Sequence, residues 1–150
     1  MKRLIGIALP LAGLARLVYW FLFRPKTRGA KVVLVNGGEI LLLRHTYERG
    51  IYGLPGGGLN SGEDPLAGLK REVSEELGIE IDPAYVGTVE SDAEYKRDTV
   101  HVFTAALIDR SSLRPDAIEI AELRWASLDG LPPLGPVTRE IIALFRKKGS

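Results

Sequence analysis

The sequence predicts an α/β domain in which strands pack against one long central helix and one closing helix. Residues 31–35 and 39–44 are rich in Val and Leu, and Asn36-Gly37-Gly38 between them is typical of a β-hairpin turn. Residues 65–77 repeat apolar side chains at helical spacing, and further strand-like runs follow them. A chain of 150 residues with a hydrophobic share of 45% suffices for one domain with its own core.

The helix expected at residues 65–77 has clear ends. Asp64 can cap its amino end, Pro65 suits the first helical position, and Gly78 suits the left-handed residue beyond the last turn. Its apolar residues recur at i, i+3, i+7 and i+11, so they form a stripe that would pack on a sheet: Leu66, Leu69, Val73 and Leu77.

The remaining elements follow from shorter patterns. Residues 86–95 and 99–108 form a second expected pair of strands, and residues 123–126 suggest another short strand. Pro132, Pro133 and Pro136 mark a loop, after which residues 137–147 are expected to form the closing helix.

Three acids gather on one arc of the central helix. Glu72 and Glu76 are four residues apart and Glu75 is three from Glu72, and like charges at such spacing cost roughly 0.2 to 0.5 kcal/mol per pair. A divalent cation would offset this repulsion, and carboxylate oxygens are ligands that Mg²⁺ prefers. Residues 54–58 end in three glycines, so we expect a loop whose backbone can approach a ligand closely. The alternative is a solvated acidic helix that follows a turn.

These residues together resemble the Nudix box, G-x5-E-x7-R-E-U-x-E-E-x-G-U, in which U is aliphatic. Asn60 stands where many members carry an acid, and Gly68 where alanine is usual. The resemblance covers residues from about 30 to 147 and implies an α/β/α sandwich with a mixed sheet. Every specified position of the box matches: Gly57, Glu63, Arg71, Glu72, Val73, Glu75, Glu76, Gly78 and Ile79.

The resemblance implies an enzyme that hydrolyses a nucleoside diphosphate linked to another moiety, such as a nucleoside triphosphate or a dinucleoside polyphosphate. Water would attack phosphorus while Mg²⁺, or Mn²⁺ in its place, neutralises the phosphate oxygens. Phosphoryl-type transfer needs positioning and charge neutralisation rather than a protein nucleophile, which suits carboxylates beside a glycine loop. The alternative is a nucleotide-binding sensor or a membrane-recruited interaction module without turnover, although the complete acid set argues against it.

The motif also implies roles for its residues. Glu72 and Glu76 would be the principal metal ligands, Glu75 a further ligand, and the Gly57 region a carbonyl donor. Arg71 would orient a carboxylate such as that of Glu63 or Glu75, or else form a surface ion pair worth about 0 to 1 kcal/mol. The proton acceptor stays open among four acids: Glu72, Glu75, Glu119 and Glu122.

Candidate substrate-binding residues lie between the second strand and the glycine loop. Side chains there could stack on a base or pair with a phosphate, although plain surface placement is an equal alternative. They are Arg44, His45, Tyr47 and Tyr52. Tyr95 follows Ile79 at a spacing that resembles dinucleoside polyphosphate hydrolases, whereas His101 and Trp125 are expected in the core or at an edge.

Charge is unevenly distributed along the chain. The net charge is +1, yet the first 31 residues carry seven bases and no acid, which leaves −6 for the remainder. An acidic catalytic domain lacks the usual basic nucleic-acid footprint, so a nucleotide-derived small molecule is expected as substrate rather than long DNA or RNA. The chain has no cysteine, which excludes disulfides, thiolate catalysis and cysteine-based zinc sites.

Residues 1–26 are expected to form an apolar helix with basic flanks, ahead of a catalytic domain at residues 27–150. The stretch 4–23 is apolar apart from Arg16 and is long enough to span a bilayer. A membrane anchor, a helix packed on the domain or on a homodimer partner, and a signal peptide all stay open. The heavier basic flank on the carboxyl side would leave the domain in the cytoplasm, tethered to the inner face of the membrane if the helix is an anchor.

Overall fold

A computed structural model describes residues 14–15, 26–92 and 97–149 of the chain. The predicted hairpin is present: β1 (Lys26–Asn36) pairs with β2 (Glu39–His45) through Val35 opposite Ile40. Gly37 and Gly38 both have positive φ angles, 59° and 79°. Such angles are required at the two central positions of the tightest hairpin turns, which explains the two glycines.

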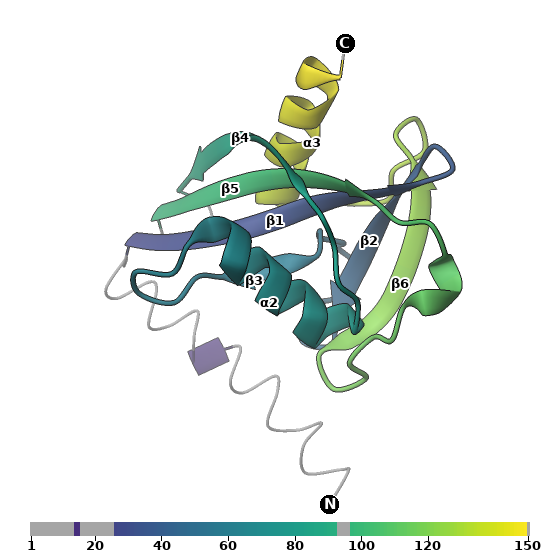
Figure 1. Cartoon of the computed structure of the whole chain (residues 1–150), viewed down its shortest axis with the longest axis horizontal. Helices are drawn as coiled ribbons and strands as arrows, with labels where there is room; N and C mark the ends of the chain where they lie inside the picture. Colours follow the sequence, from purple (N-terminus) through teal and green to yellow (C-terminus); the bar gives the residue numbers. More distant parts are fainter. Residues whose placement is uncertain (1–13, 16–25, 93–96, 150) are drawn as a thin grey trace, which may run out of the picture.

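The strands form one mixed sheet, as predicted (Figure 1). Its order is β4-β5-β1-β2-β6, with β3 also paired to β1. β4 (Ala84–Ser91) runs antiparallel to β5 (Arg97–Ala106), which runs parallel to β1, and β6 (Ile120–Ser127) runs antiparallel to β2. Both β4 and β6 begin before their predicted starts, because the pairing continues beyond the most apolar residues.

The segment at residues 54–58 was expected to be a loop, and that prediction is wrong for its last three residues. β3 (Gly56–Gly58) forms a short strand that pairs with Gly29, Ala30 and Lys31 of β1. A backbone ladder needs no side chains, so three glycines can form it. Gly56 has a φ of 122°, and a Cβ atom there would overlap the carbonyl oxygen of Ala30. Only glycine therefore fits this position.

The two long helices lie on opposite faces of the sheet (Figure 1). α2 (Pro65–Leu77) has the predicted bounds, the Asp64 carboxylate accepts from the Ala67 N–H at 3.0 Å, and Gly78 is left-handed with a φ of 65°. α3 (Pro136–Lys148) is one residue longer than predicted at each end. A short 3₁₀ turn, η2 (Arg110–Ser112), follows β5.

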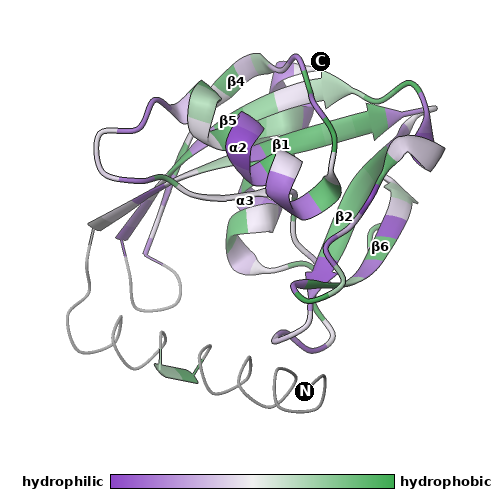
Figure 2. Cartoon of the chain, turned by 60° about the horizontal axis from the view of Figure 1, so that its bottom comes forward, coloured by the Kyte–Doolittle hydropathy of each residue, from purple (hydrophilic) through white to green (hydrophobic). Residues whose placement is uncertain are grey.

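Each helix covers its own hydrophobic core. Leu69, Val73 and Leu77 of α2 pack on one face of the sheet against Val32, Leu34, Leu41 and Phe103. Ile141 and Ile142 of α3 pack on the other face against Val33, Leu42, Leu54 and Val102. Alternate residues of β1 thus enter opposite cores, and the apolar colour of the central strands in Figure 2 follows from burial on both faces. The predicted α/β/α sandwich is confirmed.

The apolar segment predicted as a separate helix lies outside the described residues except at Leu14 and Ala15. Within the described part of the chain, no helix is both long and apolar enough to cross a membrane. The division of the chain near residue 26 therefore stays a prediction.

Candidate active site

A pocket of about 520 Å³ opens where β1 parts from β2 and pairs with β3. Its walls come from the start of β1, the connection between β2 and β3, the glycines of β3, one side of α2, and the amino end of α3. Elements from both layers of helices and from the sheet therefore meet around one cavity.

Glu76 is the most deeply buried acid of this pocket. Its side chain lies on α2 beside the core residues Val73 and Leu77, and the residue is only 2% exposed. The Gly56 N–H donates to Oε1 at 2.7 Å, and His45 Nε2 lies 3.4 Å from Oε2. A buried carboxylate is costly without such partners, so β3 and β2 together hold Glu76 in place.

Glu72 lies one helical turn earlier and also lines the pocket. Its carboxylate rests directly against Gly57, where an added Cβ atom would come within 2.7 Å of it. Burial raises the pKa of Glu72, and the nearby Glu76 charge adds to the rise, while the hydrogen bond from Arg71 opposes it. Glu75 differs from both, because its side chain is 60% exposed.

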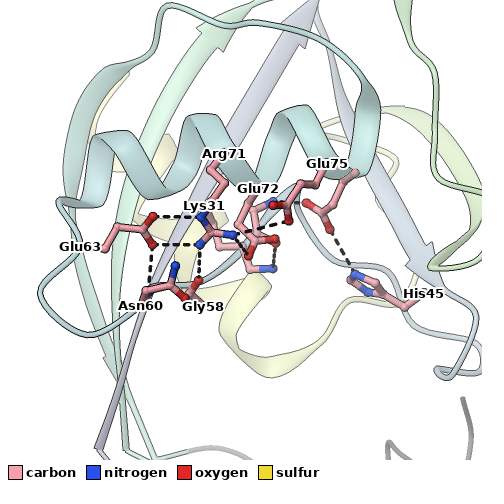
Figure 3. Close-up of polar contacts among 10 residues, drawn as sticks. Lys31, His45, Gly58, Asn60, Glu63, Arg71, Glu72 and Glu75 are labelled. Atoms are coloured by element: carbon pink, nitrogen blue, oxygen red, sulfur yellow. Dashed lines mark hydrogen bonds and ion pairs between the residues drawn. The ribbon is translucent and has the colours of Figure 1, made fainter.

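Arg71 connects the acids of the motif (Figure 3). Its Nε and Nη2 atoms each donate to one Glu63 oxygen at 2.9 Å, and its Nη1 donates to Glu72 Oε1 at 3.0 Å. Nη2 also donates to the Gly58 carbonyl at 3.2 Å, and Nη1 lies 3.5 Å from Glu75. The hydrogen bonds from Arg71 lower the pKa of Glu63 to about 2. Arg71 thus belongs to a network rather than to an isolated surface pair.

The structure explains both departures from common family usage. The contacts of Asn60 come from its backbone: the N–H donates to Glu63 Oε1 at 2.9 Å, and the carbonyl accepts from the Glu63 N–H at 3.0 Å, so neither contact requires an acid at position 60. Gly68 is buried in α2, and a Cβ atom there would overlap the Leu59 side chain and lie 2.9 Å from Glu63 Oε1. A close contact therefore requires the glycine.

Three of the predicted substrate-binding residues line the pocket. The rings of His45 and Tyr47 stack with centroids 5.1 Å apart, and Tyr52 donates its hydroxyl to Glu122 at 2.8 Å. Burial alone would lower the pKa of His45, but the carboxylates of Glu48 and Glu76 raise it overall. The pocket thus has an aromatic wall, in which His45 lies beside Glu76.

The other predicted residues are placed differently. Arg44 is not among the lining residues and lies 3.5 Å from Glu122, whereas Glu119 lines the pocket at its rim. Tyr95 lies outside the described residues. Of the two loop acids, Glu119 is therefore better placed than Glu122 to reach a bound substrate.

Trp125 lies on the edge strand β6, as expected, whereas His101 is half-buried on the inner strand β5. His101 pairs with Ala30 and Thr88 within the sheet, and burial lowers its pKa. Trp125 packs against the α2-side core, and the Arg110 guanidinium lies 4.2 Å from its ring.

Sequence reasoning missed two features of the pocket. Lys31 lines it from β1, and a charge within the apolar run of residues 30–35 is a signal that could have pointed to this residue. The amino end of α3 also lines it, where Gly135 provides no side-chain cap. No local sequence signal places that helix end beside β3.

The donor chemistry fits a hard divalent ion such as Mg²⁺, because the carboxylates of Glu72 and Glu76 lie on one helix beside the glycine backbone of β3. Within the described residues, however, no three acidic or imidazole side chains converge on a ready-made metal site. Glu72 faces Arg71 and Glu76 faces Gly56 and His45. The metal-ligand roles of Glu72, Glu75, Glu76 and Gly57 therefore stay predictions.

The sequence model of the NUDIX domain matches residues 25–145, which includes this entire pocket, all of α2 and most of α3. The chain belongs to the Nudix hydrolase family. It is 32% identical over 132 residues to the NAD-capped RNA hydrolase NudC of Pseudomonas aeruginosa, an alignment that covers 84% of this chain and 46% of that protein. The NudC of Vibrio vulnificus is 33% identical over 100 residues, or 65% of this chain and 37% of that protein. The chain thus spans less than half the length of these curated relatives.

Solved structures agree on the fold. A MutT Nudix hydrolase from Burkholderia pseudomallei is 28% identical, with a TM-score of 0.71 over 80% of this chain and 98% of that one. The MutT protein from Methanosarcina mazei Go1 is also 28% identical, with a TM-score of 0.74 over 85% of this chain and 98% of that one. The Nudix resemblance and the Nudix-type sandwich are confirmed.

Proposed function

We propose that this Nudix hydrolase uses a divalent metal ion to cleave the pyrophosphate linkage of a nucleoside diphosphate joined to another moiety. The observation that carries the proposal is the placement of Glu72 and Glu76 on one wall of a pocket that also has an aromatic wall. A pocket of about 520 Å³ lies within the usual range for small-molecule sites.

Residues of the pocket have distinct tasks in this proposal. Bound Mg²⁺, or Mn²⁺, would supply neutralisation of the phosphate oxygens, and Glu72, Glu75 and Glu76 would hold it together with a glycine carbonyl. The hydrogen bonds that hold Glu63 and Glu72 on Arg71 keep both carboxylates in fixed orientations.

The attacking water forms a new P–O bond as the bond to the leaving phosphate breaks, and its proton passes to a carboxylate. Glu72 suits that task, because partial burial raises its pKa and makes the carboxylate a better base. Glu75 and Glu119 are the other candidates: the first lies on the same helix, and the second lines the pocket rim.

For the substrate, we propose a dinucleotide or nucleotide conjugate of small size. The curated relatives are named for hydrolysis of NAD-capped RNA, so NAD joins nucleoside triphosphates, dinucleoside polyphosphates, ADP-ribose and nucleotide sugars as candidates. The stacked His45 and Tyr47 rings would support a base, and Tyr52 would support a ribose or phosphate group.

The test is a phosphate-release screen of the full chain with these compounds in Mg²⁺ and in Mn²⁺, with coupled phosphatase to reveal monophosphate products. Strong turnover of one class is expected. If the protein binds a nucleotide tightly but turns over none of these compounds, the enzymatic proposal is rejected and the alternative of a nucleotide-binding sensor is favoured.

We also propose that residues 4–23 anchor the catalytic domain at the cytoplasmic face of a membrane. The support is sequence alone, from the apolar stretch and the basic residues that follow it. Cells that express the full chain should retain it in the membrane fraction, whereas a chain that begins at Thr27 should be released. Equal distribution of the two would reject the anchor, and size-exclusion chromatography of both would show whether a homodimer depends on the same segment.

A further inference from the structure

Lys31 is the half-buried cation of the pocket. It lies on β1 opposite Gly56 of β3, and its ammonium donates to the carbonyl oxygens of Leu54 at 3.2 Å and Gly56 at 3.1 Å. An ammonium has three N–H donors and no acceptor, so one donor remains after these two contacts. Both partners are neutral carbonyl oxygens, so neither compensates the positive charge of the ammonium.

Gly56 connects this cation to the acids of α2. Its N–H donates to Glu76 and its carbonyl accepts from Lys31, so a carboxylate and an ammonium stand at the two ends of one glycine residue. Residues of β1 alternate between the faces of the sheet, and Lys31 shares the face of Val33, which belongs to the core under α3. Lys31 therefore reaches the pocket from the α3 side, whereas Glu72 and Glu76 reach it from the α2 side.

The charges that line the pocket favour a cation at this position when the substrate is an anion. Five carboxylates line it: Glu48, Glu72, Glu76, Asp98 and Glu119. Apart from His45, the lining bases are Lys31 and Arg28, and Arg28 is exposed and donates to the Glu63 carbonyl at 3.4 Å. A polyphosphate that enters this pocket meets repulsion from the acids, and the half-buried ammonium is the side chain placed to oppose it.

We propose that Lys31 binds the diphosphate of the substrate by donating its remaining N–H to a phosphate oxygen. The phosphate chain then lies between the acids of α2 and the ammonium of β1. Lys31 is a binding and positioning residue in this proposal, and the water and the proton acceptor are on the acid side. The inference rests on the proposed function, because it assigns a further residue to that same pocket.

The competing explanation is purely structural. Lys31 could serve only to tie residues 54 and 56 to β1, in which case its loss would lower stability and leave substrate affinity alone. The two explanations differ in their prediction for Lys31→Gln, which removes the charge and keeps a shorter side chain that can still donate a hydrogen bond.

The experiment compares the full wild-type chain with Lys31→Gln and Lys31→Arg. It measures KM and kcat for the substrate found in the screen, the affinity for inorganic pyrophosphate with Mg²⁺ by calorimetry, and the thermal midpoint of each variant. Lys147→Gln on the exposed end of α3 removes the same charge away from the pocket and is the matched control.

Loss of one charge-assisted hydrogen bond predicts a rise in KM and in the pyrophosphate dissociation constant of about 10- to 100-fold in Lys31→Gln. The change in kcat should be smaller, Lys31→Arg should lie nearer the wild type than Lys31→Gln, and Lys147→Gln should match the wild type. KM and pyrophosphate affinity within twofold of wild type in a folded Lys31→Gln would overturn the inference.

Two further measurements distinguish failure of the inference from failure of the proposed function and from misfolding of the variant. If the wild type turns over nothing, the proposed function fails, but weaker pyrophosphate binding by Lys31→Gln would still support the inference. If Lys31→Gln does not fold, the wild type with lysines labelled with ¹³C at Cε provides the test by NMR, because this label leaves all three N–H donors in place. Pyrophosphate should then shift the Lys31 signal and leave that of Lys147 in place, and an unmoved Lys31 signal would contradict the proposal.

Discussion

At the scale of single residues, the site depends on glycines as much as on acids. Gly57 has no side chain because the Glu72 carboxylate occupies the space where a Cβ atom would be. Gly56 has no side chain because the Ala30 carbonyl oxygen occupies the corresponding space. Gly57 therefore makes room for an acid of α2 and Gly56 for the backbone of β1, which gives a physical reason for the glycine that begins the motif and for the one before it.

Glu76→Gln should remove most of the turnover and leave the fold intact. Glutamine keeps the Oε1 acceptor for the Gly56 N–H, so the thermal midpoint should move little. It removes the negative charge of a predicted metal ligand, so we expect kcat/KM to fall by about 100-fold or more, or roughly 2.7 kcal/mol of transition-state stabilisation.

Steady-state kinetics in Mg²⁺ and a thermal melt check this expectation. Glu140→Gln, on the exposed side of α3, removes the same charge and should behave as the wild type. A Glu76→Gln enzyme with full Mg²⁺-dependent activity would show that Glu76 is not a metal ligand.

The acids could be located from the sequence because their spacing is local. Once residues 65–77 are helical, Glu72 and Glu76 must share a face, and the structure places both at the pocket. Lys31 depends instead on β3 lying beside β1, a contact across 25 residues of chain. No sequence pattern within β1 or β3 indicates that these two strands lie side by side.

At the scale of elements, α2 was predicted with its bounds because its signals are short-range: a capping carboxylate, a first-turn proline and a left-handed glycine. β3 was missed because three glycines show none of the side-chain alternation by which strands are recognised. The amino end of α3 could be predicted as a helix start but not as a wall of the pocket, since that requires knowledge of the tertiary packing.

Gly68→Ala should destabilise the protein, contrary to helix propensity. Alanine in a helix interior is favoured over glycine by about 1 kcal/mol. At this position the added methyl would overlap Leu59 and press on the Glu63 carboxylate, which the bidentate contact with Arg71 holds in place. Overpacking costs typically 1 to 3 kcal/mol, so we expect a net loss of about 1 kcal/mol.

Urea denaturation of the wild type and Gly68→Ala measures this difference. Ala67→Gly, one residue earlier at an exposed position of the same helix, reports the propensity cost without the packing change. A more stable Gly68→Ala variant would mean that Leu59 and Glu63 move aside freely, and that the glycine is not required by contact.

At the scale of the whole molecule, the fold class followed from two faces of apolar residues. The Val and Leu runs of β1 and β2 are continuous because both faces of the sheet are buried, one under each amphipathic helix. The order of the strands in the sheet could not be predicted from these apolar patterns. β1 pairs in parallel with β5 from Lys26 to Val35, and such a distant partner is selected by the packing of the complete chain.

The stability of the whole molecule should change with pH, and Glu63 contributes a loss of stability in acid. The pKa of Glu63 lies at about 2 in the folded protein, below its ordinary 4.5, because Arg71 and the Asn60 N–H stabilise the carboxylate. A lowered folded-state pKa contributes stability that is present above about pH 4.5 and is lost as the pH falls toward 2. Glu72 acts in the opposite sense, because its raised pKa favours the folded state at low pH.

These opposing contributions require a difference measurement rather than a single acid titration. The thermal midpoint of the wild type should exceed that of Glu63→Gln at pH 7, and the gap should narrow steadily between pH 5 and about 3 as Glu63 gains a proton in the unfolded chain. Glu140→Gln on α3, measured in parallel, removes a carboxylate at an exposed position outside this network. A gap that stays constant across this pH interval would mean that the Arg71–Glu63 contact does not couple ionisation to folding, and that Arg71 acts on Glu72 alone.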